Sequence, residues 1–231
     1  MKRFYQSVAV KPIGAGWQVH LDGRPLRTVG GQAQAVPTRA LAEALAAEWA
    51  GQGSEIDPGR FVLRDLADYA LDVVAPDRPA AVAALLRFAE TDTLCYRAAA
   101  DEPLHARQIE VWEPLLRAAE ARWDVHFVRV EGVIHQAQAS ETLARMRSVL
   151  ESHDDFTLAA LATLASLAAS LVIALAALAP EADVADMWMA ASLEEEWQAD
   201  LWGRDAGAEA LRAQRFASFA AAVSFARLAR V

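Results

Sequence analysis

The sequence predicts an α+β protein, with a small N-terminal domain of β-strands and a packed helix followed by a larger all-α domain. Residues 4 to 36 alternate apolar and polar side chains between turn signals, whereas the later segments show helical periodicity. The stretch Ala75-Pro76-Asp77-Arg78-Pro79 separates the two patterns and is the best candidate for a boundary. We therefore expect domains at residues 1–76 and 77–231.

The strands of the first domain are predicted by side-chain alternation. Trp17, Val19 and Leu21 alternate with polar neighbours, which is the period of a half-buried strand. Asp22-Gly23 follows and is a strong signal for a two-residue hairpin, with residues 24–28 as the returning strand.

Two helices complete the first domain. Thr38 is expected to cap the first helix, and Leu41, Leu45 and Trp49 form its apolar stripe at i, i+4 and i+8. A second helix is expected over residues 62–74.

The rest of the chain is predicted to be mainly helical. Pro114 should kink or restart the helix that begins at Pro103, because proline removes a backbone donor. Ser140 is expected to cap the next helix. Residues 157–180 carry no charge, but their alanine-rich composition and acidic flanks favour a buried helix, or two that meet near residues 166–170, over a membrane span. Further helices are expected over residues 79–91, 186–205 and 206–228.

Residues 186–205 read as one helix that carries three tryptophans and three consecutive glutamates. Trp188, Glu195 and Trp202 share one face of this helix. A carboxylate on that face needs an arginine, backbone N–H groups or water, because an unpaired buried charge is costly. Gly203 marks the end of the helix.

Composition excludes several classes of partner. The formal net charge is −9 and the pI is near 5.1, which argues against nucleic acid and anionic membranes. A single cysteine excludes an internal disulfide framework and fits a reducing compartment. The N-terminus has no apolar segment of the kind that secretory signals carry.

Motifs for catalysis or metal binding are thin, so we expect no catalytic, cofactor-binding or metal site. Phosphate-loop, nucleophile-elbow, H-E-x-x-H and C-x-x-C patterns are absent from the sequence. Cys95 has apolar neighbours and reads as a packed thiol. Glu102 and His105 have the Glu-x-x-His spacing of di-iron bundles, but only one copy occurs. The three glutamates at 194–196 diverge by about 100° per residue and cannot flank one bond.

A set of short phrases occurs in a fixed order along residues 2 to about 205. The phrases are Lys2-Arg3-Phe4-Tyr5, Leu21-Asp22-Gly23-Arg24-Pro25 with Thr28, Pro37-Thr38 then Leu41-Ala42, Glu48-Trp49 with Gln52, Ile56 with Pro58, residues 91–97 (TDTLCYR), Gln108, Trp112, Pro114, Glu195, Glu196, Gln198, Trp202-Gly203 and Asp205. Taken together, they make the sequence similar to the assembly chaperones that act on the alpha subunit of the catalytic sector of F-type ATP synthase. That family is found in mitochondria and alphaproteobacteria.

The resemblance implies a protein that holds the unassembled alpha subunit until it pairs with the beta subunit, without hydrolysing nucleotide. It implies partner-binding roles for Trp49, Glu195, Glu196, Gln198 and Trp202. Of the two acids, Glu196 is the better candidate for direct contact, whereas Glu195 orients the helix or pairs with an arginine. Trp49 also completes an apolar stripe, so a core role competes with a binding role.

The expected setting is the cytoplasm of a bacterium, or the mitochondrial matrix if the source is eukaryotic. The free protein is expected to be monomeric, without membrane insertion or cofactor. Two alternatives stay open: a small helical enzyme with buried carboxylates, which needs a pocket and a second ionisable group near Glu195, and an interaction module with another partner.

Overall fold

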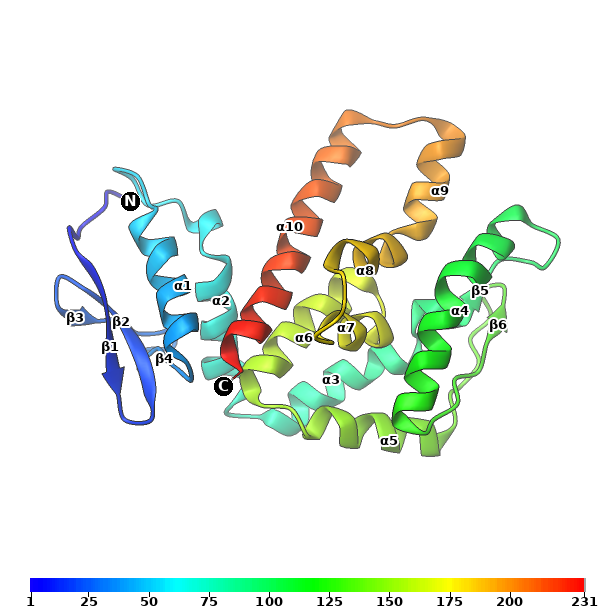
Figure 1. The fold of residues 1–231 in the computed structure, drawn as a ribbon, viewed down its shortest axis with the longest axis horizontal. Helices are drawn as coiled ribbons and strands as arrows, with labels where there is room; N and C mark the ends of the chain where they lie inside the picture. The colour runs from blue at the N-terminus through cyan, green and yellow to red at the C-terminus, as the bar shows by residue number, and fades with distance from the viewer. Residues whose placement is uncertain (231) are drawn as a thin grey trace. The chain divides into compact units, whose positions relative to one another are not determined.

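The computed structural model describes residues 1–230 and confirms the predicted α+β class, with strands concentrated near the N-terminus and ten α-helices along the chain. Figure 1 follows these elements in order. The chain divides into two compact units. Unit 1 comprises residues 1–78, residues 154–160 and the described chain from residue 221 onward, and unit 2 comprises residues 79–153 and 161–220. The boundary at residue 76 predicted from the sequence stays a prediction.

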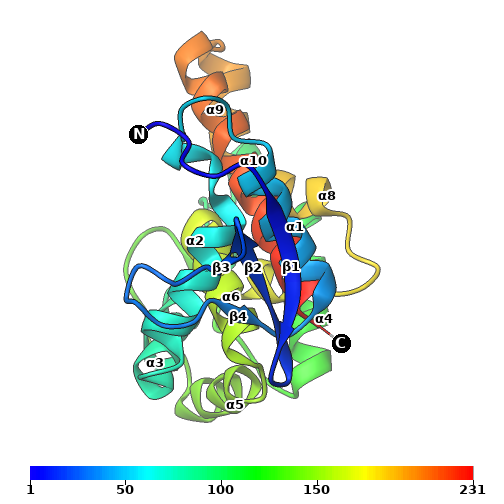
Figure 2. The ribbon, with the colours of Figure 1, turned by 90° about the vertical axis from the view of Figure 1, so that its left-hand side faces the viewer.

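The sheet of unit 1 is organised around strand β2 (Gly16–Leu21). Strand β1 (Val8–Ile13) pairs antiparallel with its whole length, and the short strands β3 (Arg24–Pro25) and β4 (Ala35–Val36) pair antiparallel with its two ends. Figure 2 shows strands β1 and β2 side by side. Asp22 and Gly23 have φ values of 48° and 78°, as a tight primed hairpin turn requires. The predicted turn is confirmed.

Helix α1 (Arg39–Ala50) packs on this sheet, and the predicted N-cap is confirmed because the Thr38 side chain accepts from the backbone N–H of Leu41. After the 3-10 turn η1 (Pro58–Arg60), helix α2 (Val62–Tyr69) continues as a π-helical turn, η2 (Ala70–Val74). Glu48 of α1 accepts hydrogen bonds of 2.7 and 2.9 Å from the backbone N–H groups of Leu63 and Arg64. The start of α2 is therefore capped by its neighbour.

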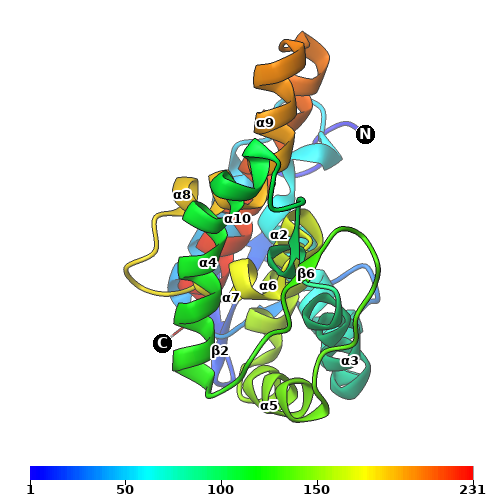
Figure 3. The same ribbon diagram turned by 90° about the vertical axis from the view of Figure 1, so that its right-hand side faces the viewer.

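The first part of unit 2 contains three helices and a small two-stranded parallel sheet, whose second strand is labelled β6 in Figure 3. Helix α4 (Pro103–Trp123) is continuous through Pro114, so the helix does not restart there, which was one of the two predicted outcomes; proline removes one N–H, and the surrounding turns continue. Ser140 is the first residue of its helix and Ala139 occupies the cap, so the predicted cap is wrong by one position. The elements are α3 (Arg78–Glu90), η3 (Thr93–Cys95), β5 (Tyr96–Arg97), α4 (Pro103–Trp123), β6 (Val130–Glu131), which pairs parallel with β5, and α5 (Ser140–Glu151).

The apolar segment forms two helices, α6 (Asp155–Ala168) and α7 (Leu171–Ala177), as one of the two sequence readings expected. Ala169 breaks the helix with a positive φ of 48°, and the Ser170 hydroxyl caps α7 by accepting from the backbone N–H of Ile173. Within residues 1–230, no helix is long and apolar enough to cross a membrane.

The acidic tryptophan segment is also divided, into α8 (Val184–Ala191) and α9 (Leu193–Trp202), so the prediction of one helix is wrong. Ser192 lies between them with φ −98° and ψ 12°, and its hydroxyl donates back to the carbonyl of Trp188. Gly203, with φ 96°, ends α9 as predicted. Helix α10 (Ala206–Ala229) follows.

Candidate functional site

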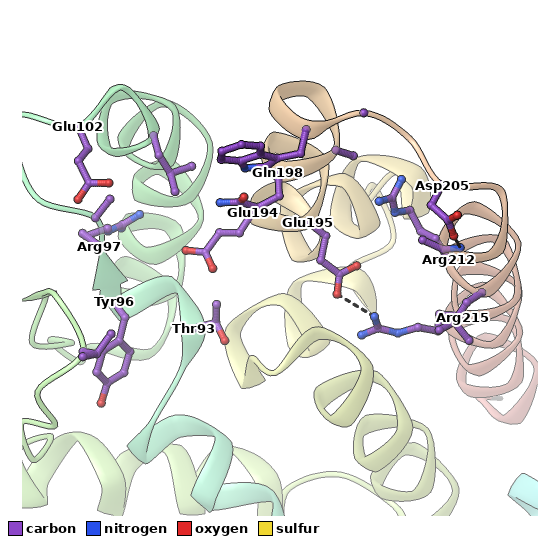
Figure 4. Close-up of a pocket in the computed structure, with 18 of the residues that line it drawn as sticks. Thr93, Tyr96, Arg97, Glu102, Glu194, Glu195, Gln198, Asp205, Arg212 and Arg215 are labelled. Atoms are coloured by element: carbon purple, nitrogen blue, oxygen red, sulfur yellow. Dashed lines mark hydrogen bonds and ion pairs between the residues drawn. The ribbon is translucent and has the colours of Figure 1, made fainter.

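A broad surface groove with a volume of about 1050 Å³ lies within unit 2. Its walls come from α9, the first half of α10, the segment from Thr91 to Leu104 that includes β5, and the loop after β6. We call it the α9 groove, because α9 supplies Glu194, Glu195, Gln198, Ala199 and Trp202 to its lining. Figure 4 shows Glu194, Glu195 and Gln198 from α9 opposite Arg97 and Glu102.

The three consecutive glutamates of α9 point in different directions, and each contacts a different part of unit 2. Glu194 accepts a 2.7 Å hydrogen bond from the Nε2 amide of Gln108 on α4, and Glu195 pairs with Arg215 of α10 at 2.8 Å (Figure 4). Glu196 pairs with Arg212 at 2.7 Å and with Arg204 at 2.9 Å. The angular divergence that rules out shared catalysis lets these side chains reach separate partners.

Helix α9 depends on these polar contacts because it buries little apolar surface. Leu193 is its only buried residue. The preceding helix is anchored differently: Trp188 packs against Phe216 and Phe219 of α10, and the Trp112 indole donates to the carbonyl of Ala190 at 2.8 Å. Helix α8 is therefore anchored by aromatic packing, whereas α9, which forms one wall of the groove, is held by side-chain hydrogen bonds and ion pairs.

The structure brings three of the residues singled out from the sequence into the groove: Glu195, Gln198 and Trp202. As expected, Glu195 pairs with an arginine. Glu196 faces away from the groove and lines a second pocket of about 450 Å³ beside Trp197. Its side chain is 19% exposed, against 50% for Glu195, and both carboxylates are paired. Direct partner contact by Glu196 stays a prediction.

Trp49 is not part of the groove. It belongs to unit 1, is 7% exposed, and packs against Tyr5 and Phe61 with ring-centroid distances of 5.5 and 4.4 Å. The Tyr5 hydroxyl donates to the Trp49 carbonyl at 2.6 Å. These contacts give Trp49 a core role, and a role in binding a partner stays a prediction.

The wall opposite α9 contains residues that the sequence did not single out as a site. Arg97 is 5% exposed; its Nη1 donates to the Gln108 carbonyl at 3.0 Å and its Nη2 to Glu113 at 3.3 Å. Burial lowers the pKa of Arg97, and Glu113 opposes that shift. Gln108 is 1% exposed, and its Oε1 accepts from the Ala98 N–H while its Nε2 holds Glu194. In the sequence, Arg97 and Gln108 stood out only as members of the short phrases that carry the family resemblance.

The base of the groove is fixed by Asp92, which is fully buried beside the lining residues Thr91 and Thr93. Its two carboxylate oxygens accept from the backbone N–H groups of Leu94 and Val172, the second residues of η3 and α7. Burial raises the pKa of Asp92 to about 6, although these hydrogen bonds oppose the shift. One carboxylate therefore joins two elements that are about 80 residues apart.

The rim of the groove exposes large apolar side chains. Val133, Trp202 and Leu211 line it and are 94%, 83% and 58% exposed. Within residues 1–230 no group of three or more histidine, cysteine or acidic side chains is placed to hold a metal ion. Cys95 is buried, and burial raises its pKa to about 12. A wide groove with an exposed apolar rim is the kind of site through which one protein binds another.

Comparisons with known proteins agree with this class. The model of the family described as ATP12 chaperone protein matches residues 2–120. The chain is 26% identical over 214 residues to mitochondrial protein atp12 of Schizosaccharomyces pombe, covering 87% of this chain and 74% of that protein. The solved structure of Atp12 from Paracoccus denitrificans is 38% identical, covers 99% of this chain and 98% of that one, and superimposes with a TM-score of 0.92. A proposed chaperone from Agrobacterium tumefaciens is 36% identical, with coverages of 99% and 86% and a TM-score of 0.94.

The chain belongs to the ATP12 chaperone family. The resemblance seen in the sequence is confirmed, and with it an assembly-chaperone role for the F-type ATP synthase.

Proposed function

We propose that the client is the unassembled alpha subunit of the F-type ATP synthase. The protein holds this subunit until the subunit pairs with the beta subunit, and it hydrolyses no nucleotide. The observation that carries the proposal is the α9 groove, which places Glu195, Gln198 and Trp202 beside an exposed apolar rim. A subunit waiting for its partner exposes apolar interface surface, and such surface needs an apolar counterpart. Glu196 and Trp49 belong to the proposed binding machinery through the family resemblance.

The enzyme alternative requires a pocket and a second ionisable group near Glu195. The α9 groove meets both requirements, because Arg215 lines it beside Glu195. Catalytic acids and bases are typically desolvated and poised to exchange protons. Glu195 is half exposed and already committed to an ion pair with Arg215. Family membership together with this geometry favours binding over catalysis.

The proposed setting is the cytoplasm of a bacterium rather than a mitochondrial matrix, with a monomeric free protein. Identity supports the bacterial setting: it reaches 38% and 36% with the Paracoccus and Agrobacterium proteins, against 26% with the mitochondrial relative.

Co-expression with each ATP synthase subunit separately tests the function. We expect the alpha subunit to become more soluble and to co-purify, and the beta subunit to do neither. Retention of beta instead of alpha, or of neither subunit, contradicts the proposed client.

Charge reversal at Glu196 tests its role. Glu196→Lys places a third cation beside Arg204 and Arg212, so we expect less alpha subunit to co-purify. Glu110→Lys is the matched control, since Glu110 is an exposed α4 residue that pairs with Arg107. Equal retention by both variants, with unchanged circular dichroism, contradicts a role for Glu196.

A further inference from the structure

The charges lining the α9 groove are unevenly paired. Each of its arginines already has a carboxylate partner: Arg97 pairs with Glu113, Arg212 with Glu196 and Glu209, and Arg215 with Glu195. The remaining carboxylates meet only neutral donors among the described residues. These are Glu102, Glu194 and Asp205, which accept from the Ala99 N–H, the Gln108 amide and the Ala208 N–H. The lining holds five carboxylates and three arginines, so the groove carries a net negative charge.

One face of α9 arranges this charge in order. Glu194, Gln198 and Trp202 are spaced i, i+4 and i+8, so they form a single stripe along the helix, and all three line the groove. Figure 4 shows the Glu194 and Gln198 side chains entering the groove together. The stripe offers a carboxylate, then an amide that both donates and accepts, and then an indole that is 83% exposed.

We propose that the α9 groove binds an extended, basic and apolar segment of the client, lying along α9. A lysine or arginine of the segment meets Glu194, its backbone hydrogen-bonds to the Gln198 amide, and a large apolar side chain packs on Trp202 and Val133. Glu194 and Trp202 are eight residues apart, or about 12 Å along the helix axis. An extended chain covers that distance in about four residues, which sets the spacing of the two side chains. This inference rests on the proposed function, because it describes which part of the client is held.

Co-purification with the alpha subunit tests the apolar end. We expect Trp202→Ser and Val133→Ser each to reduce retention about 10-fold or more, since each removes a large apolar contact. Val29→Ser is the matched control: Val29 is 88% exposed but lies in unit 1. Because these side chains are exposed, the variants should keep the wild-type melting temperature.

The basic end is tested by charge and salt. Glu194→Gln should weaken retention about two- to five-fold at low salt and make it less sensitive to added salt. Glu141→Gln, on an exposed position of α5, is the control.

Peptides that tile the alpha subunit identify the segment. Cys95 is buried, so a dye on Ala208→Cys, an exposed position of the groove lining outside the proposed contacts, labels one site; a dye on Val29→Cys serves as control. We expect the peptides that change the signal at position 208 to carry a basic residue about four positions from a large apolar one. If peptides without a basic residue bind equally well, or if none binds although wild-type protein retains the alpha subunit, the inference is wrong. Failure of the wild-type protein to retain the alpha subunit would instead refute the proposed function.

Discussion

Asp92 should make the stability of unit 2 depend on pH in an unusual direction. Its carboxyl is fully buried, and burial raises its pKa from 3.8 to about 6. Since the folded pKa lies above the unfolded value, the stability linked to this group is fully present below pH 4 and is lost as the pH rises through 6. A shift of about two units corresponds to about 3 kcal/mol, because one unit is 1.36 kcal/mol.

Asp92→Asn isolates this effect, because asparagine cannot ionise. The variant keeps one oxygen acceptor for the N–H groups of Leu94 and Val172, so we expect it to fold but to be less stable than wild type at pH 4. The difference in the free energy of unfolding should then shrink by about 2 kcal/mol between pH 4 and pH 7, most of the full effect, because the unfolded carboxyl is already partly ionised at pH 4.

Urea unfolding of both proteins at pH 4, 5, 6 and 7, followed by tryptophan fluorescence, measures that difference. Asp183→Ala, which removes an exposed N-cap of α8, shows what the loss of a surface cap costs, about 1 kcal/mol. If the difference in the free energy of unfolding between wild type and Asp92→Asn stays constant across this range, or widens toward pH 7, the raised pKa of Asp92 is refuted.

Three further outcomes are expected. Ala169→Gly should raise the free energy of unfolding by about 1 kcal/mol, because Ala169 has a φ of 48°; an unchanged or lower melting temperature contradicts this. Glu48→Ala should destabilise unit 1 by about 1–3 kcal/mol by leaving two N–H groups of α2 uncapped, and thermal melting monitored by circular dichroism would detect it. Cys95 should not react with thiol reagents in the native protein and should react on unfolding, because burial raises its pKa to about 12; rapid native labelling would refute this.

Local chemistry explains why much of unit 1 was predictable. The Asp22-Gly23 turn and the Thr38 cap are encoded by residues that lie next to the structure they specify. The same holds for the C-terminal end of α9 at Gly203. These predictions needed no knowledge of distant contacts.

The break between α8 and α9 had no comparable local signal. Residues around Ser192 are acceptable in a helix, so periodicity favoured continuity. Tertiary contacts decide otherwise: Trp188 is fixed against Phe219 on one side of the break, and Glu194 is held by Gln108 on the other. The break at residue 192 depends on those contacts, so it could not be predicted from the sequence alone.

The site was predictable on one wall only. The acidic segment that carries Glu195, Gln198 and Trp202 attracted attention by composition, and it does line the groove. The facing wall is assembled from Arg97 and the loop at Val133, which are far from α9 in sequence. Their neighbourhood depends on the packing of unit 2, so spacing along the chain did not reveal it.

The three-way attachment of α9 has a consequence for how the groove behaves over time. A helix that buries one residue and is otherwise held by carboxylates loses little hydrophobic energy when it moves, and water can replace each of its tethers. The backbone amides of α9 should therefore exchange with solvent much faster than those of α7, in which nearly every side chain is buried. Because this wall of the groove can move, the groove can adapt to a client that is not yet fully folded, while the packed core of the chaperone stays unchanged.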